Sequence, residues 1–180
     1  MESAILIIDL QVGLFDEPGK PFAYPETINR INKITDVARK KQIPVILIQH
    51  EQDEGVLKFN SPGWSLVDDL EIDSHYYKVR KTTPNSFLRT NLGEILNKEN
   101  VKNLIICGYA TEFCIDSTVR GAAALGYSIE LVSDCHTTHD KSHAKAEIII
   151  KHHNETLSNI KSFGVDITAV ESKEILKKIG

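Results

Sequence analysis

The feature that most constrains the fold of this 180-residue chain is a set of short, nearly continuous aliphatic runs. Four stand out in the sequence: Ala4–Ile8, Pro44–Ile48, Leu104–Cys107 and Ser128–Val132. Such runs are typical of strands buried on both faces of a parallel sheet, because half-buried strands alternate apolar and polar residues instead. The sequence therefore predicts a parallel sheet, to which we add strands near Tyr76–Val79 and Val165–Ala169.

Segments with helical periodicity lie between these predicted strands. Pro25–Lys41 carries aliphatic residues at intervals of three, with acidic Glu26 in its first turn and basic residues in its last. The other predicted helices are Thr111–Leu125, His139–Phe163 and Ser172–Lys178. This alternation predicts an α/β fold, a Rossmann-like, doubly wound, mostly parallel sheet flanked by helices on both faces. A single domain over residues 1–180 is expected at this length.

Charge and hydropathy restrict the partners and the compartment. The net charge of −4 provides no basic excess for phosphates, so we expect no nucleic-acid partner. No window approaches the roughly 20 apolar residues of a membrane helix, and the N-terminal apolar run is too short for a signal peptide. We therefore expect a cytoplasmic protein with no membrane partner. The three cysteines lack CxxC spacing and are expected to be free thiols.

Polar residues gather where the predicted strands end. Ligands bind beyond the carboxyl ends of the strands in open parallel sheets. The residues at those ends include an acid, a base and a thiol, namely Asp9, Lys81 and Cys114, and a second group, Asp134, Cys135 and His136. The long segment His50–Leu70 breaks the strand and helix rhythm, and long loops in compact domains are often functional.

Cys114 has the most reactive position of the three thiols. It follows a strand-to-helix turn and falls in the first turn of the predicted helix. Free N–H groups and the dipole at a helix N-terminus lower a cysteine pKa, in some proteins to about 3.5. The alternative is that Cys114 is a small buried hydrophobic residue. Cys107, inside an apolar strand, is expected to pack, and a neighbouring Asp134 carboxylate should raise the pKa of Cys135.

Asp9 and Lys81 each have two interpretations. Asp9 ends a buried aliphatic run, where it is either a general base or a cap for the following turn. Lys81 either holds a carboxylate and a thiolate in their charged forms or belongs to a solvated run of charges.

Four motifs together resemble one family over nearly the whole chain, the isochorismatase-like cysteine hydrolases, which include nicotinamidases. The first is an aliphatic strand ending in Asp9-Leu10-Gln11. The second is a lysine followed by a Ser-x-Phe or similar segment, here Lys81 and then Ser86-Phe87, with Thr90-Asn91-Leu92 leading into a helix. The third is Gly108-x-x-Thr111-x-x-Cys114, and the fourth is Asp134 after the next strand. The resemblance rests on their order and on their places at the strand ends.

The resemblance implies a catalytic triad, with Cys114 as nucleophile, Asp9 as general acid and base, and Lys81 as the cation between them. It also implies a cis peptide between Tyr109 and Ala110, and backbone N–H groups of Ala110 and Cys114 that bind an oxyanion. Because members that hydrolyse isochorismate lack the cysteine, its presence favours a small amide or ureide substrate. A homo-oligomer, a dimer or tetramer, is also implied.

Residues that contact a substrate or a metal are also predicted. The expected substrate-binding residues follow strand ends or lie in the long loop: Gln11, Phe15, His50, Trp64 and Tyr109. Nicotinamidases carry an Asp-x-His metal motif after the second strand, whereas this chain has Gln49-His50-Glu51, so we expect no metal and no other cofactor. A metal at His50, or at His136, His139 and His143, the last two one helical turn apart, remains the alternative.

Two other classes of function remain open from the sequence. One is a catalytically quiet binding or scaffold protein that keeps the fold without a cognate amide. The other is a redox-active thiol protein in which Cys114 forms a disulfide with Cys135. Replacement of Cys114 separates the hydrolase from both.

Overall fold

Six parallel strands form one sheet in the computed structural model, which describes residues 2–16 and 19–180. Their order across the sheet is β3-β2-β1-β4-β5-β6. The strands are β1 (Ser3–Ile8), β2 (Val45–His50), β3 (Tyr77–Lys81), β4 (Asn103–Tyr109), β5 (Ser128–Thr137) and β6 (Ile167–Val170). The predicted α/β class with a doubly wound parallel sheet is confirmed.

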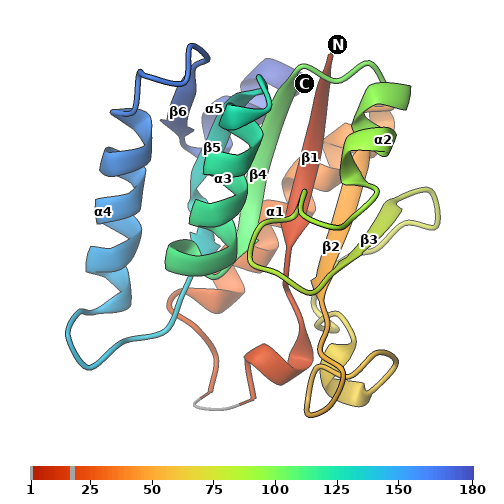
Figure 1. Ribbon diagram of the computed structural model, residues 1–180, viewed down its shortest axis with the longest axis vertical. Coiled ribbons are helices and arrows are strands. Elements are labelled where there is room, and N and C mark those ends of the chain that lie inside the picture. Colours follow the sequence, from red (N-terminus) through yellow and green to blue (C-terminus); the bar gives the residue numbers. More distant parts are fainter. Residues whose placement is uncertain (1, 17–18) are drawn as a thin grey trace.

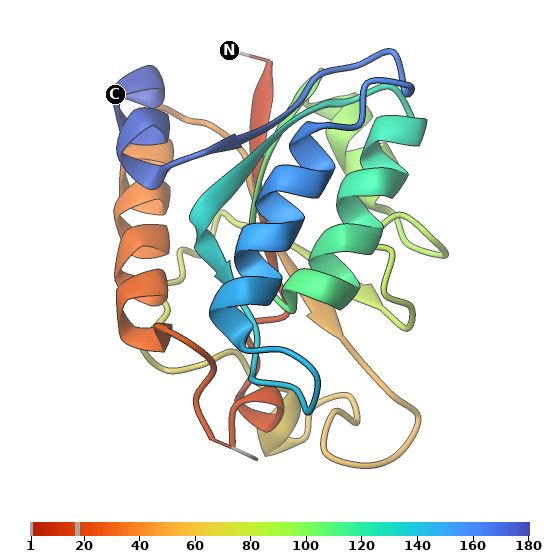
Figure 2. The ribbon, with the colours of Figure 1, turned by 90° about the vertical axis from the view of Figure 1, so that its left-hand side faces the viewer.

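Helices cover both faces of this sheet (Figures 1 and 2). One face packs against α1 (Tyr24–Lys40) and α5 (Ser172–Ile179), and the other against α2 (Leu92–Lys98), α3 (Asp116–Ala124) and α4 (Ala146–Ser158). Each face has its own hydrophobic cluster, and the strands supply side chains alternately to the two. None of the described helices has the length and apolar character needed to cross a membrane.

The aliphatic runs become strands because both of their faces are covered. All six residues of β1 are buried, as are the first five of β2. In α1 the predicted stripe of Ile28, Ile31 and Ile34 is buried against the sheet. Complete burial of one such aliphatic side chain contributes about 1.5–3 kcal/mol, so these positions dominate the packing of the fold.

Two predicted elements have different bounds in the structure. β5 continues past its aliphatic run to Thr137, because Tyr109 of β4 still pairs with it there. The helix predicted over 139–163 covers only Ala146–Ser158, since Asp140 accepts a hydrogen bond from the Ala146 N–H at 2.9 Å and residues 138–145 form a loop. His139 and His143 therefore precede α4 and are not one turn apart on a helix.

The strand order reverses between β1 and β4, and ligand sites of doubly wound sheets lie at such a reversal. Gly108, near the end of β4, has a φ of +127°, and a Cβ there would lie 2.1 Å from the carbonyl oxygen of Ile8. Only glycine permits this close approach. It brings the chain after β4 beside Asp9, directly after β1.

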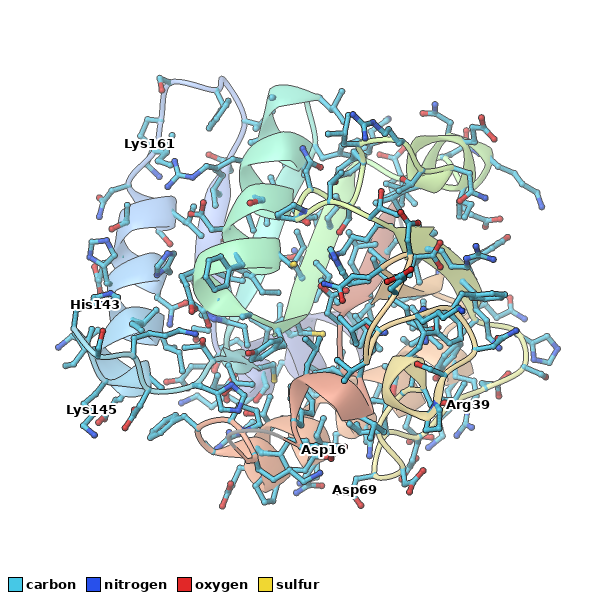
Figure 3. All side chains as sticks on the ribbon, turned by 60° about the horizontal axis from the view of Figure 1, so that its bottom comes forward. Asp16, Arg39, Asp69, His143, Lys145 and Lys161 are labelled. Carbon is cyan, nitrogen blue, oxygen red and sulfur yellow. The ribbon has the colours of Figure 1, made fainter. Side chains whose placement is uncertain are left out.

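The long loop after β2 folds back onto the chain after β1. The Val12 N–H donates to the Ser65 carbonyl at 2.9 Å, and the Val67 N–H donates to the Leu10 carbonyl at 3.0 Å. The two segments lie side by side below the sheet in Figure 1. The loop is therefore held at the carboxyl end of the strands, the end that faces the viewer in Figure 3.

Candidate active site

The ammonium group of Lys81 is the centre of a buried polar cluster. It donates to Asp9 Oδ2 at 2.6 Å, to Cys114 Sγ at 3.2 Å, and it lies 3.2 Å from His50 Nδ1. Lys81 is the last residue of β3, where exposed and buried side chains alternate, so Val79 and Lys81 point inward and Lys78 points to solvent. The strand period thus distinguishes Lys81 from Lys78.

Asp9 contributes a carboxylate of which only one oxygen is hydrogen-bonded within the described part of the chain. Its side chain is 1% exposed, and Lys81 binds Oδ2, but Oδ1 is buried without a hydrogen-bond partner among the described residues. The ligand atoms of Asp9, His50 and Cys114 all lie within 4.8 Å of one another. A buried acceptor without a partner is costly, so this oxygen is a functional feature rather than a structural cap.

Cys114 lies in a π-helical turn, Thr111–Ile115, that leads directly into α3. Burial raises the pKa of its thiol to about 12; the Asp9 carboxylate also raises it, and Lys81 opposes the rise. The expected lowering of the pKa by the helix N-terminus is therefore wrong for this state. Burial and Asp9 outweigh the helix terminus, and the resting site holds a thiol beside an Asp9–Lys81 ion pair.

The backbone before Cys114 has the predicted cis peptide between Tyr109 and Ala110. Ala110 is 2% exposed, and its carbonyl accepts from the N–H groups of Phe113 and Ile115. Within the described residues the Ala110 N–H itself has no hydrogen-bond partner. A free N–H next to the nucleophile is what an oxyanion site requires.

A cavity of about 280 Å³ opens onto this cluster. Its walls combine the reactive groups with apolar side chains: Asp9, Leu14, His50, Gln52, Leu57, Tyr109, Ala110, Phe113 and Cys114. Four of these wall residues were not predicted from the sequence: Leu14, Gln52, Leu57 and Phe113. Leu14 ends a three-residue 3-10 helix, and Gln52 and Leu57 lie in a loop. None of these segments has a periodic pattern, so only their proximity to Asp9 and His50 in sequence could have suggested them.

Among the five predicted substrate-binding residues, only His50 and Tyr109 line the cavity. Gln11 is completely buried, and its side-chain amide binds both backbone groups of His50, accepting from its N–H at 2.8 Å and donating to its carbonyl at 2.9 Å. Phe15 packs edge-on behind Tyr109 with ring centroids 5.1 Å apart. Trp64 packs against Phe59 instead, beside a different hollow. Gln11 and Phe15 therefore support the wall rather than form it, and the Trp64 side chain lies outside this cavity.

Tyr109 is held in place through His139. The Tyr109 hydroxyl lies 2.9 Å from His139 Nδ1, and His139 Nε2 lies 2.6 Å from the Gly19 carbonyl. Because a carbonyl only accepts, Nε2 carries a proton, and in the neutral ring Nδ1 accepts from the tyrosine hydroxyl. Burial raises the pKa of Tyr109 to about 12, so the phenol stays neutral.

The second group of candidates, Asp134, Cys135 and His136, belongs to β5 and not to the loop after it. Asp134 accepts from the N–H and hydroxyl of Ser172 at 2.7 and 2.8 Å, at the start of α5. His136 is buried between Thr111 Oγ1 and Asn154 Oδ1, each 2.9 Å from a ring nitrogen. Both ring nitrogens are thus engaged, which argues against a metal at His136, His139 and His143.

Ser86 of the second motif has a structural partner. Its hydroxyl lies 2.8 Å from the Thr118 hydroxyl, and its N–H donates to the same oxygen at 3.1 Å. Both side chains are completely buried. The pair ties the segment that follows Lys81 to α3, the helix that follows the turn carrying Cys114.

Comparison with known proteins agrees with this fold. The model of the Isochorismatase domain family matches residues 3–168. The chain belongs to the isochorismatase family. A solved structure described as an isochorismatase family protein superposes with a TM-score of 0.86, at 33% identity over 94% of this chain and 98% of that one.

Two relatives of known sequence show how far the likeness extends. The uncharacterized isochorismatase family protein YddQ of Bacillus subtilis is 33% identical over 146 residues, which cover 77% of this chain and 79% of that protein. A streptothricin hydrolase of Streptomyces noursei is 30% identical over 141 residues. That match covers 76% of this chain but only 50% of the hydrolase, so the chain matches about half of that relative's length.

Proposed function

We propose that this protein is a cysteine-dependent hydrolase that cleaves a C–N bond of a small amide or ureide through a thioester. The observation that carries the proposal is the unpartnered Asp9 Oδ1, buried within reach of the Cys114 thiol while Lys81 binds the other carboxylate oxygen. A family relative at 30% identity is a streptothricin hydrolase, which supports hydrolysis in general. The substrate is part of the proposal.

The first half-reaction forms the thioester. As Cys114 Sγ attacks the carbonyl carbon, its proton passes to Asp9 Oδ1. The carbonyl oxygen becomes an oxyanion that accepts from the N–H groups of Ala110 and Cys114. When the C–N bond breaks, the proton on Asp9 moves to the leaving nitrogen, so ammonia or an amine departs and Asp9 is again a carboxylate.

The second half-reaction restores the thiol. Asp9 takes a proton from a water molecule as the water oxygen attacks the thioester carbonyl. The C–S bond breaks, Cys114 recovers the proton, and the carboxylic acid product leaves. Lys81 pairs with Asp9 in the resting state and donates to the developing thiolate during attack.

The pH dependence of Cys114 alkylation tests this arrangement before any substrate is known. Because Asp9 raises the pKa of Cys114 and Lys81 lowers it, Asp9→Asn should shift iodoacetamide labelling of Cys114 to lower pH, and Lys81→Met should shift it to higher pH. Peptide mass spectrometry identifies the labelled residue, and circular dichroism verifies that each variant is folded. If neither substitution changed the pH dependence of Cys114 labelling, the result would contradict the triad.

A screen of small amides and ureides then tests turnover. Ammonia release by the wild-type protein should disappear in Cys114→Ala. Equal release by both proteins on every compound would favour the binding or scaffold alternative. A Cys114–Cys135 disulfide under mild peroxide would favour the redox alternative, but Cys135 packs with the cluster under α1 and α5 whereas Cys114 packs with the opposite cluster.

The proposed partners are a small-molecule substrate and further copies of the chain. Phe113 and Ile148 are 55% and 58% exposed and border an apolar groove of about 430 Å³ between the π-helical turn and α4. Phe113 also lines the catalytic cavity, so a second copy seated on the groove would lie close to the substrate. Light scattering of the wild type and of Ile148→Lys measures the oligomeric state; a monomeric wild type would contradict this part.

A further inference from the structure

The catalytic cluster contains one group that the proposed reaction does not use, the imidazole of His50. His50 ends β2, and its side chain lines the catalytic cavity. Its backbone cannot shift easily, because the buried Gln11 amide binds both its N–H and its carbonyl. The ring is therefore held at a defined place in the wall, beside Asp9 and Cys114.

The partners of Lys81 determine which ring nitrogen of His50 carries the proton. An ammonium group has three N–H donors and no acceptor, and Lys81 has three neighbours at hydrogen-bond distance: Asp9 Oδ2, Cys114 Sγ and His50 Nδ1. Nδ1 must accept, so the neutral ring carries its proton on Nε2. Burial and the charge of Lys81 lower the pKa of His50, which agrees with a neutral ring.

The Nε2–H group is directed to the cavity. Throughout residues 2–16 and 19–180 no side chain or backbone group lies within hydrogen-bond distance of His50 Nε2. It is also not among the buried side-chain atoms that lack a partner, so it is accessible from the open space that His50 lines. The cavity thus offers one hydrogen-bond donor of fixed position, next to the nucleophile.

The other walls of the cavity limit the size and polarity of a ligand that can bind beside this donor. Leu14, Leu57 and Phe113 supply apolar walls, and the volume of about 280 Å³ suits a small acyl group. A ligand that fills such a space without an acceptor opposite Nε2–H would leave that donor desolvated and unpaired. A ligand with an acceptor at that place satisfies it.

We propose that His50 selects the substrate: its Nε2–H donates to a hydrogen-bond acceptor in the acyl part of a small amide. This inference rests on the proposed function, since it concerns the same cavity and nucleophile. It goes further by naming the donor, its tautomer and the chemical feature that the substrate must carry.

The experiment uses four amides that differ in one ring atom. Benzamide has no ring acceptor, and the three pyridinecarboxamide isomers move one acceptor nitrogen around the same ring. Each is added to the wild-type protein at pH 8.5 while iodoacetamide labels Cys114, and the concentration that halves the labelling rate measures occupation of the cavity. We expect one isomer to protect about tenfold better than benzamide, the effect of one neutral hydrogen bond. Turnover of each amide is measured in parallel.

Two substitutions of His50 distinguish the roles of its two ring nitrogens. Asparagine keeps an acceptor near Nδ1 for Lys81 but cannot reach the place of Nε2, so His50→Asn should reduce the tenfold preference to about one. Glutamine places an amide N–H near Nε2, so His50→Gln should keep most of the preference. His75→Asn is the matched control, because the His75 side chain is 91% exposed and precedes β3, at the opposite end of that strand from Lys81; it should keep the wild-type preference.

The outcomes separate this inference from the proposed function. Equal protection by all four amides, protection by none, or a preference that persists in His50→Asn would overturn the role of His50. The Asp9-dependent and Lys81-dependent labelling of Cys114 would still support the hydrolase. Labelling of Cys135 instead of Cys114 would overturn the proposed function and the inference together.

Discussion

The carboxyl edge of the sheet carries two sets of the same three residue types, and they differ in how completely they are hydrogen-bonded. Around Lys81, the carboxylate of Asp9 has one unpartnered oxygen, and His50 has one engaged ring nitrogen. In β5, Asp134 binds Ser172 through both of its oxygens, and His136 binds through both nitrogens. Complete pairing marks a structural group, and incomplete pairing leaves capacity for a reaction.

Cys114 and Cys135, the thiols of the two sets, also differ in how open and how well placed for a reaction they are. Cys114 lines a cavity and contacts Lys81, whereas Cys135 is completely buried, and burial, the neighbouring Cys107 and Asp134 all raise its pKa. An aspartate beside a thiol therefore does not make a catalytic pair by itself. The Asp9–Cys114 pair also has a cation and an opening for the substrate.

The largest expected difference is between the two cysteines. Cys114→Ala should lower kcat/KM by at least about 10⁴-fold, because no other group supplies the covalent intermediate. Cys135→Ala should keep turnover and lose only about 1 kcal/mol of unfolding free energy through a small cavity. Steady-state kinetics and urea denaturation measure the two effects. Loss of turnover in Cys135→Ala with an intact fold would break the comparison.

Substitution of Asp9 or of Asp134 should give a smaller difference in kcat/KM than substitution of the two cysteines. Asp9→Asn should lower kcat/KM by at least about 10²-fold, the usual contribution of a general acid and base, even though its thiol alkylates at lower pH. Asp134→Ala removes the acceptor for the first N–H of α5 and should cost about 2 kcal/mol of stability with turnover kept. If Asp134→Ala lost turnover at full stability instead, Asp134 would belong to the catalytic group.

The histidine of β5 should affect stability only in acid. Burial lowers the pKa of His136 from 6.5 to about 4. Between these values the unfolded chain binds the additional proton, so the unfolding free energy falls as pH drops from about 6.5 to 4, by about 3 kcal/mol in all. His136→Asn cannot titrate and should flatten that part of a pH series of urea denaturations. An unchanged slope would show that His136 is not the group responsible.

The fold was largely predictable from the sequence because its signals are local. Continuous aliphatic runs identify strands covered on both faces, and the Ile28, Ile31 and Ile34 stripe identifies α1. The predicted helix over 139–163 was too long. α4 begins only at Ala146, seven residues after the predicted start, where the Asp140 carboxylate accepts from the Ala146 N–H. Side-chain caps of this kind depend on how the loop closes.

The sequence alone determined which residue types stand at the strand ends, since Asp9, Lys81 and Cys114 each follow or end a recognisable strand. Only the tertiary structure decided between the two sets of acid, thiol and imidazole. The reversal of strand order beside β1, and the close approach at Gly108, bring Asp9 to the chain that carries Cys114. Because pairing and burial are properties of that arrangement, the pKa of Cys114, the tautomer of His50 and the free oxygen of Asp9 follow from packing and not from sequence position.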